Sequence, residues 1–186
     1  MKKLNGKGFT LIELLAVITI MGILMLVAIP AVSRTIENSR RDTFANAAKE
    51  YVNAVRNAVL ADNISCNSTS ASGTPDGTYY FVLDQTSIKD LMEAGGKSPF
   101  GGADMSGYVK WVKSTTISGD SAKTTTSYYI SLSDTGKHGL TKNTGTTPAP
   151  SEVSENEIKR AVVNTALSAQ SAAAPTDSGA VACTLN

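Results

Sequence analysis

The stretch "GKGFTLIELLAVITIMGILMLVAIPAV", residues 6–32, decides the fold of this chain. It is apolar from Phe9 to Val32, and Glu13 is the only charged residue in that range. A helix of this length rises about 1.5 Å per residue and is roughly 36 Å long, enough to cross a hydrocarbon core of about 30 Å. A charge within such a helix costs at least about 2.5 kcal/mol on insertion. The sequence therefore predicts a transmembrane helix in which Glu13 has a partner or a function.

The residues on either side of this stretch set its orientation. Lys2, Lys3 and Lys7 precede it, and the positive-inside rule keeps such residues on the cytoplasmic side. An ordinary secretory signal ends in an A-x-A-like cleavage site, but the segment "SRTIENSRR" after Val32 has none. We therefore expect a cytoplasmic-membrane protein whose N-terminus lies inside and whose remainder lies outside.

With these features, "KGFTLIELLAVITIMGILMLVAIP" resembles the class III signal peptide and first helix of type IV pilins and pseudopilins. The resemblance rests on the basic leader, on Gly8 and Phe9, on the glutamate at the fifth position after Gly8, and on the apolar helix with Gly22 and Pro30. The short leader is more similar to Gram-positive than to Gram-negative members. The resemblance implies the α+β fold of a type IV pilin of the N-methylphenylalanine family.

The resemblance also implies how the chain is processed and which proteins it meets. A prepilin peptidase cuts the Gly8–Phe9 bond, which removes the leader 1–8, and the new amine of Phe9 is methylated. Gly8 has no side chain, so a peptidase can approach its backbone closely. The implied partners are further copies of this chain in a helical homopolymer, the prepilin peptidase, an extension ATPase and a platform membrane protein.

Cleavage would give Glu13 a positively charged partner. We hypothesise that its carboxylate pairs with the Phe9 amine of the neighbouring subunit as that subunit enters a fibre. Removing the partner of a buried charge costs about 3–5 kcal/mol, so this pair would set the axial register of the subunits. The alternative is that Glu13 lies near the helix end and reaches the lipid headgroups.

Gly22 and Pro30 are expected to weaken the helix. Relative to alanine, glycine costs about 1 kcal/mol in a helix and proline about 3 kcal/mol, because proline removes a backbone hydrogen bond. The resemblance implies that the segment between these residues can be extended in the assembled fibre. A simple kink at Pro30 is the alternative.

The helical pattern continues beyond the apolar stretch. Apolar residues at positions 44, 48, 51, 55 and 59 follow steps of four, three, four and four, the spacing of one helical face. We predict one helix over about residues 9–62, whose second half packs on a small antiparallel sheet. The predicted domains are the leader 1–8, a hydrophobic half-helix 9–32 for the membrane and the fibre core, and an outer head 33–186.

Within the head, the aromatic and β-branched segment "TYYFVLD" (78–84) predicts a strand. Segments 107–116 and 123–134 predict an antiparallel hairpin with a loop longer than two residues. Other segments have weaker signals: 63–78 has the composition of a loop, and 180–185 is read as an edge strand. Ser154, followed three residues later by a glutamate, predicts the start of a short helix.

The composition and the motifs argue against several function classes. Lys and Arg number 17 against 16 Asp and Glu, and no dense basic run with interleaved aromatic residues suggests nucleic-acid binding. The patterns H-E-x-x-H, G-x-S-x-G and the EF-hand loop are absent. We therefore expect no catalytic activity, no cofactor and no metal site. The only histidine, His138, is expected to be an exposed side chain without a role.

The two cysteines, Cys66 and Cys183, are too far apart in the sequence for local zinc spacing. In an exported protein they permit one disulfide, which would stabilise the fold by about 4–5 kcal/mol in the chain-entropy model. The alternative is two free thiols.

The function that these features favour is structural. We expect a type IV pilus subunit that leaves the membrane to form an extracellular fibre for adhesion, surface motility or biofilm formation. The alternative within the family is a pseudopilin of a type II secretion or competence (DNA-uptake) system. The alternative from another class is a single-pass membrane-anchored receptor or enzyme.

Overall fold

The structure is a computed structural model, and it divides into two compact units, Met1–Ser39 and Arg40–Asn186, each of which is described by itself. The described residues are 8–66, 75–84, 86–92 and 95–186. The boundary between the units falls seven residues after position 32, where the hydrophobic half-helix is predicted to end. Residues 1–7 of the predicted leader lie outside the described residues.

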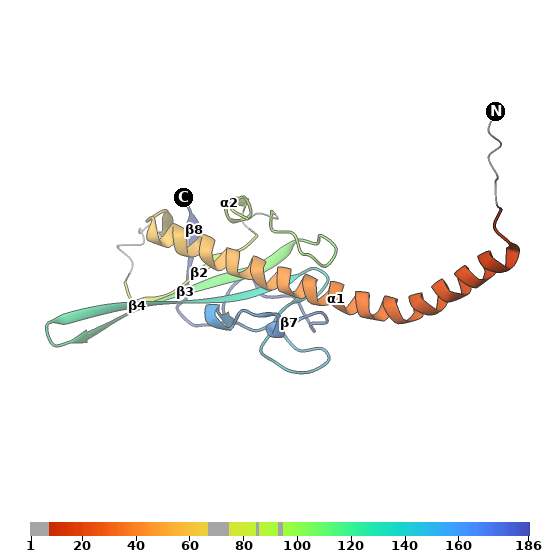
Figure 1. The fold of residues 1–186 in the computed structure, drawn as a ribbon. Helices are drawn as coiled ribbons and strands as arrows, with labels where there is room; N and C mark the ends of the chain where they lie inside the picture. The colour runs from red at the N-terminus through yellow and green to blue at the C-terminus, as the bar shows by residue number, and fades with distance from the viewer. Residues whose placement is uncertain (1–7, 67–74, 85, 93–94) are drawn as a thin grey trace, which may run out of the picture. The chain divides into compact units, whose positions relative to one another are not determined.

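One long helix, α1, runs from Leu11 to Leu60 and contains 50 residues (Figure 1). Its ends lie two residues inside the predicted range, and it stays helical through Gly22 and Pro30. Within the second unit it lies across the sheet and buries the predicted face. The fully buried residues of that face are Phe44, Ala48, Tyr51 and Val55. The prediction of a long helix packed on a sheet is confirmed.

The sheet of the second unit has eight described strands. They are β1 (Ile64–Cys66), β2 (Gly77–Val82), β3 (Met105–Ser118), β4 (Ser121–Asp134), β5 (Gly139–Leu140), β6 (Val153–Ser154), β7 (Val163–Asn164) and β8 (Val181–Leu185). The order is β1-β8-β2-β3-β4-β5-β7, and β6 pairs with β4. A short helix, α2 (Thr86–Lys89), follows β2. The predicted sheet was antiparallel; the observed one is mixed, because β8 pairs in parallel with β2.

The hydrophobic core lies between α1 and the sheet. Trp111, the only tryptophan, is 2% exposed, and its ring centroid lies 5.0 Å from that of Tyr79 on the neighbouring strand. Phe81 and Ile130 from β2 and β4 are fully buried in the same cluster. The long strands β3 and β4 form the centre of the sheet and pair in an unbroken register from Met105↔Asp134 to Ser118↔Ser121.

The turn between β3 and β4 is tighter than predicted. Both strands extend past the expected ends, so that only Gly119 and Asp120 connect Ser118 to Ser121. Gly119 has a φ of 61°, a left-handed conformation that glycine adopts without steric strain. The Ser- and Thr-rich tip has little apolar alternation, which explains why the sequence pattern ends too early.

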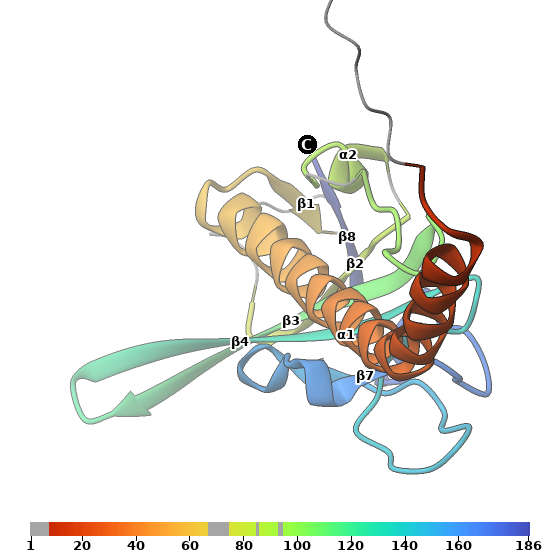
Figure 2. The same cartoon turned by 45° about the vertical axis from the view of Figure 1, so that its right-hand side comes forward.

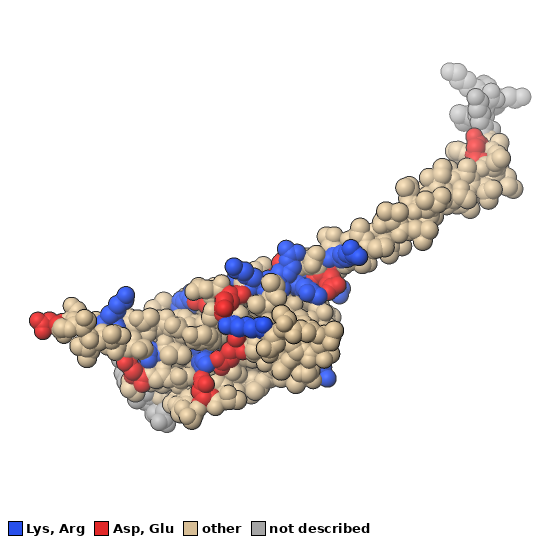
Figure 3. Space-filling view, turned by 90° about the horizontal axis from the view of Figure 1, so that it is seen from below, with Lys and Arg blue, Asp and Glu red and all other residues tan. Residues whose placement is uncertain are grey.

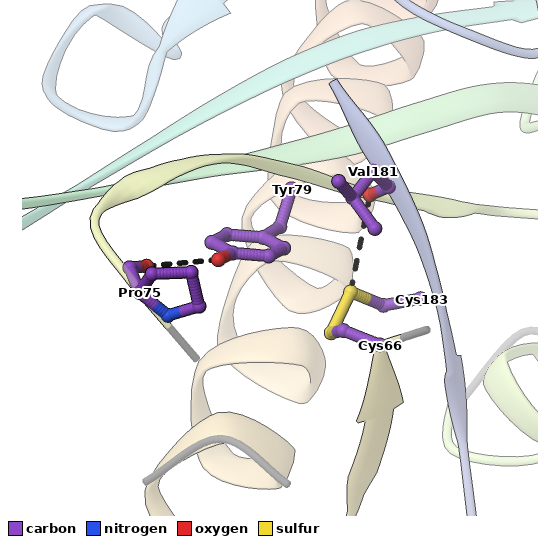
Figure 4. Close-up of a disulfide and its surroundings, with 5 residues drawn as sticks. All are labelled: Cys66, Pro75, Tyr79, Val181 and Cys183. Atoms are coloured by element: carbon purple, nitrogen blue, oxygen red, sulfur yellow. Dashed lines mark hydrogen bonds between the residues drawn. A yellow bond between two sulfur atoms is a disulfide. The ribbon is translucent and has the colours of Figure 1, made fainter. Parts of the chain in front are cut away.

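The predicted loop 63–78 and the predicted edge strand 180–185 are both corrected by one contact. Residues Ile64–Cys66 form β1, which pairs antiparallel with β8. Cys66 and Cys183 stand directly opposite each other and form a disulfide (Figure 4). The C-terminal strand β8 is therefore an interior strand, and β1 is at the edge. Positions 67–74 of the predicted loop lie outside the described residues.

The helix predicted after Ser154 is also corrected. The segment forms two short 3₁₀ turns, Glu155–Glu157 and Arg160–Val162. The Ser154 N–H donates to the Glu157 carboxylate at 3.3 Å, as a helix start requires. The helix does not continue, because Val163 enters the sheet opposite Leu140. Pairing with a distant strand overrides the local helix signal.

Candidate functional site

The first unit has an apolar surface without cover. Every described residue from 8 to 40 is exposed, including large apolar side chains such as Phe9 at 89% and Leu26 at 76%. From residue 9 to 32 the only charged side chain is Glu13, and Figure 3 shows a long uncharged surface with one acidic group close to its start. The helix is long and apolar enough to cross a membrane. In water such a surface is unfavourable, so lipid or other protein must cover it.

The acidic group in this surface, Glu13, is bound to Thr10. The Thr10 N–H and its hydroxyl both donate to Glu13 Oε2 at 2.8 Å, and the Glu13 N–H donates to the Thr10 hydroxyl at 3.3 Å. These reciprocal bonds are a capping box, in which a threonine before the helix and a glutamate three residues later satisfy each other's backbone N–H groups. The carboxylate also lies at the positive end of the helix dipole. Glu13 therefore stabilises the start of α1.

Thr10 was missed by the sequence reasoning. The signal was present in the letters "TLIE", which have the threonine and the glutamate at the spacing of a capping box before an apolar run. The box ties the carboxylate to the peptide group that follows Phe9, so the charge is held at the end of the apolar segment.

Gly8 and Phe9 precede the helix. Residues 8–10 have no helical hydrogen-bond pattern, and α1 begins at Leu11. A Cβ placed on Gly8 would have nothing within 4 Å, and the Phe9 side chain is exposed. Exposed backbone outside regular structure is where peptidases act most readily. The Gly8–Phe9 bond thus has the accessibility that the predicted cleavage requires.

Gly22 and Pro30 both lie inside α1. Pro30 has no N–H, so the carbonyl of Leu26 loses the donor it would have in a regular helix. Nearby, the Ser33 hydroxyl donates to the carbonyl of Ile29 at 3.0 Å. The helix is continuous in this state, and its weakening under load stays a prediction.

Two cysteines that are remote in the sequence meet in the second unit. Their Cα atoms are 4.2 Å apart, and each residue is 1% exposed. Of the two alternatives left by the sequence, the structure has the disulfide. It joins edge strand β1, which follows α1 directly, to the C-terminal strand β8 (Figure 4).

His138 is not the exposed side chain that was expected. Its Nδ1 lies 2.9 Å from Asp134 Oδ2, and its ring stacks on Phe100 with 4.4 Å between the centroids. Ser98 donates its hydroxyl proton to Asp134 Oδ2 at 2.6 Å and is not bonded to the histidine. A serine acts as a nucleophile when an adjacent general base, such as a histidine, accepts its proton. This cluster instead fastens the turn around Ser98 to the end of β4.

The comparison with known families adds one finding. Residues 3–29 match the family described as the prokaryotic N-terminal methylation motif. No match was found among curated proteins or among solved structures. The N-terminal segment fits a type IV pilin-like class III signal peptide, and its apolar helix is consistent with membrane anchoring as a prepilin. The matched range includes Gly8, Phe9, Glu13 and Gly22, and it ends one residue before Pro30.

Proposed function

We propose that this chain is the structural subunit of a type IV pilus. The prepilin peptidase cuts it after Gly8, the amine of Phe9 is methylated, and the mature chain polymerises through its N-terminal helix into an extracellular fibre. The observation that carries this proposal is the methylation motif at the head of an apolar half-helix that nothing in its own unit covers.

A bundle of identical helices can cover this surface once the subunit leaves the membrane. Lipid is as apolar as these side chains, so the exchange of lipid for sister helices gains little hydrophobic free energy. Packing and electrostatics must then decide which arrangement forms. The energy for extraction comes from outside the chain, in this proposal from the extension ATPase acting through the platform protein.

The capping box supports a role for Glu13 in selecting how the subunits are arranged. Its bonds to Thr10 hold the carboxylate at the end of the helix where cleavage creates the Phe9 amine. In a staggered bundle, the amine of an incoming subunit can approach a carboxylate that is already oriented. A charge pair in a water-free core is strong when its geometry is good and is heavily penalised when one partner is missing. The pair therefore selects one axial register.

The experiment is mass spectrometry of material sheared from the cell surface. We expect an abundant chain whose N-terminal peptide begins with methylated Phe9. Replacing Gly8 with leucine should leave the uncut precursor in the membrane, and Gly22→Ala is the matched control that should still be cut.

Two other outcomes would contradict the proposal. A methylated chain that stays in the cell envelope and is absent from the sheared fraction would favour a pseudopilin of a secretion or DNA-uptake system. A mature chain that retains Met1 and the leader would favour a membrane-anchored receptor or enzyme.

A further inference from the structure

The distal part of the β3–β4 hairpin, residues 114–126, forms an arm that the rest of the head does not cover. The last β3 residue that pairs with β2 is Lys113, and the first β4 residue that pairs with β6 is Tyr129. Beyond these positions the two strands pair only with each other. Figures 1 and 2 show the ribbon extending past the other strands of the sheet. Thr115 is half-buried, and all other arm residues are exposed.

Hydrogen bonds hold the base of the arm although the arm is exposed. Asp76 receives the Thr115 N–H at 2.6 Å and the Thr115 hydroxyl at 2.9 Å, which occupies the open edge of β3 just past the end of β2. The hydroxyl oxygens of Thr115 and Thr124 lie 3.1 Å apart across the strands. A preorganised element loses less conformational entropy on binding than a loose loop.

One face of the arm carries an apolar group at its end. Ile117 is 76% exposed and stands opposite Ala122. Side chains alternate along a strand, so Ile117 lies on the face that carries Val109 and Trp111 in the core. The core face of the sheet therefore continues outward past the area that α1 covers. Ile117 is therefore an apolar side chain left in solvent at the tip of a hydroxyl-rich ribbon.

The second unit also carries a groove that fits such a group. Its volume is about 570 Å³. The C-terminal part of α1 forms one wall, with Ala54 and Ala58, and Leu91 and Leu185 stand on the other side. Leu91 is 58% exposed. The one charged residue among the lining side chains in the described parts of the chain is Glu50.

We propose that the arm of one subunit docks into this groove on the next subunit, with Ile117 against Leu91. The inference rests on the proposed function, because a fibre supplies neighbouring copies at high local concentration. Among the described residues of Arg40–Asn186, the exposed large apolar side chains are Leu60, Leu91 and Ile117. One of the three ends the arm and another lines the groove.

The occupant is a second copy because the arm cannot fold back on its own chain. Its strands continue the central register of the sheet, and Asp76 fastens its base. A contact between two different surfaces of identical chains is heterologous, and such contacts form open helical filaments when they do not close into a ring. The arm contact therefore adds a second, head-to-head link to the polymer that the N-terminal helices form.

The test is a double-cysteine variant of the full chain, Ile117→Cys with Leu91→Cys, expressed in cells that assemble the fibre. Both native cysteines are in the disulfide, so the introduced thiols can pair with each other. Sheared fibres should give a ladder of covalent oligomers on a non-reducing denaturing gel, and reductant should collapse it to the monomer. Ala122→Cys with Leu91→Cys is a second pair on the same face and should also give a ladder.

The matched control is Thr116→Cys with Leu91→Cys, which moves the thiol by one residue to the opposite face of the arm. It should give no ladder. Fibres that contain methylated Phe9 but no oligomers from either test pair would overturn the arm contact and leave the pilin function standing. Dimers from Ile117→Cys alone would overturn it in favour of arm-to-arm pairing. A wild-type chain that forms no fibre would refute the proposed function, and the arm contact with it.

Discussion

Replacing Glu13 with glutamine separates the charge of this residue from its hydrogen bonds. The amide oxygen of glutamine can accept the same two bonds from Thr10, since glutamine also serves at this position of a capping box. The variant enters the membrane more easily than wild type because it has no charge there. The variant also loses the interaction of the charge with the helix dipole, worth about 0.3–1 kcal/mol, so a defect larger than this must lie in the loss of the pair with the Phe9 amine.

The expected defect is large. Leaving a buried charge without its partner costs about 3–5 kcal/mol, which corresponds to a roughly 100- to 4000-fold weaker addition of each subunit. Replacing Thr10 with valine is the matched variant, because it removes the hydroxyl that Glu13 N–H donates to but keeps the charge. Loss of a helix cap costs about 0.5–2 kcal/mol, or roughly 2- to 30-fold. Loss of the Glu13 charge should therefore weaken subunit addition more than loss of the helix cap.

The assay compares sheared fibre with mature subunit left in the membrane, by quantitative immunoblot, for Glu13→Gln, Thr10→Val and wild type. We expect all three chains to be cut at Gly8, with fibre lost in the glutamine variant and reduced in the valine variant. Normal fibre from Glu13→Gln together with no fibre from Thr10→Val would refute the pairing, and would assign Glu13 to the start of the helix alone.

Three further properties can be measured. Changing both Cys66 and Cys183 to alanine should lower the free energy of unfolding of the head by up to about 4–5 kcal/mol, followed in detergent by the fluorescence of the single buried tryptophan; an unchanged urea midpoint would contradict this. Burial, with nearby Asp and Glu charges, raises the pKa of Tyr51 to about 12, so stability should be full below pH about 10 and fall as the pH rises to about 12. Over this pH range, circular dichroism should show a smaller loss of stability for Tyr51→Phe than for wild type. An equal loss would exclude Tyr51 as the cause. Replacing Gly22 and Pro30 by alanine should strengthen the helix by roughly 1 and 3 kcal/mol, and single-fibre stretching should then need more force for the same extension.

The long helix was predictable because its signals are local. An apolar run from residue 9 to 32 and a helical face from 44 to 59 leave little alternative to a helix. Each observed end lies two residues inside the predicted one. The strand β2 and the β3–β4 hairpin were likewise visible as β-branched and aromatic runs. Their true length was hidden at the tip, where serine and threonine stand on both faces of the ribbon.

The rest of the head depends on contacts between remote residues. The three residues of β1 form a strand because β8 and the disulfide lie beside them, and β8 becomes an interior strand for the same reason. The segment after Ser154 begins with a helix-start signal, but at Val163 it pairs with another strand of the sheet. Sequence patterns along a few residues do not contain these pairings.

Within the candidate site, the sequence identified the residues but missed one of the bonds. Gly8, Phe9 and Glu13 follow from the motif, and the motif match covers them. The bond from Thr10 to Glu13 could have been predicted from the spacing of the two residues. His138 was misread because Asp134, four residues earlier, lies across a turn that brings the two side chains together.

The most direct test of the central claim is the position of Glu13 in an assembled fibre, measured by electron cryomicroscopy at side-chain resolution. We predict that its carboxylate lies within hydrogen-bond distance of the methylated Phe9 amine of a neighbouring subunit, in a core of packed helices from which water is excluded. A carboxylate that faces water, or fibres whose subunits still carry the leader, would contradict it.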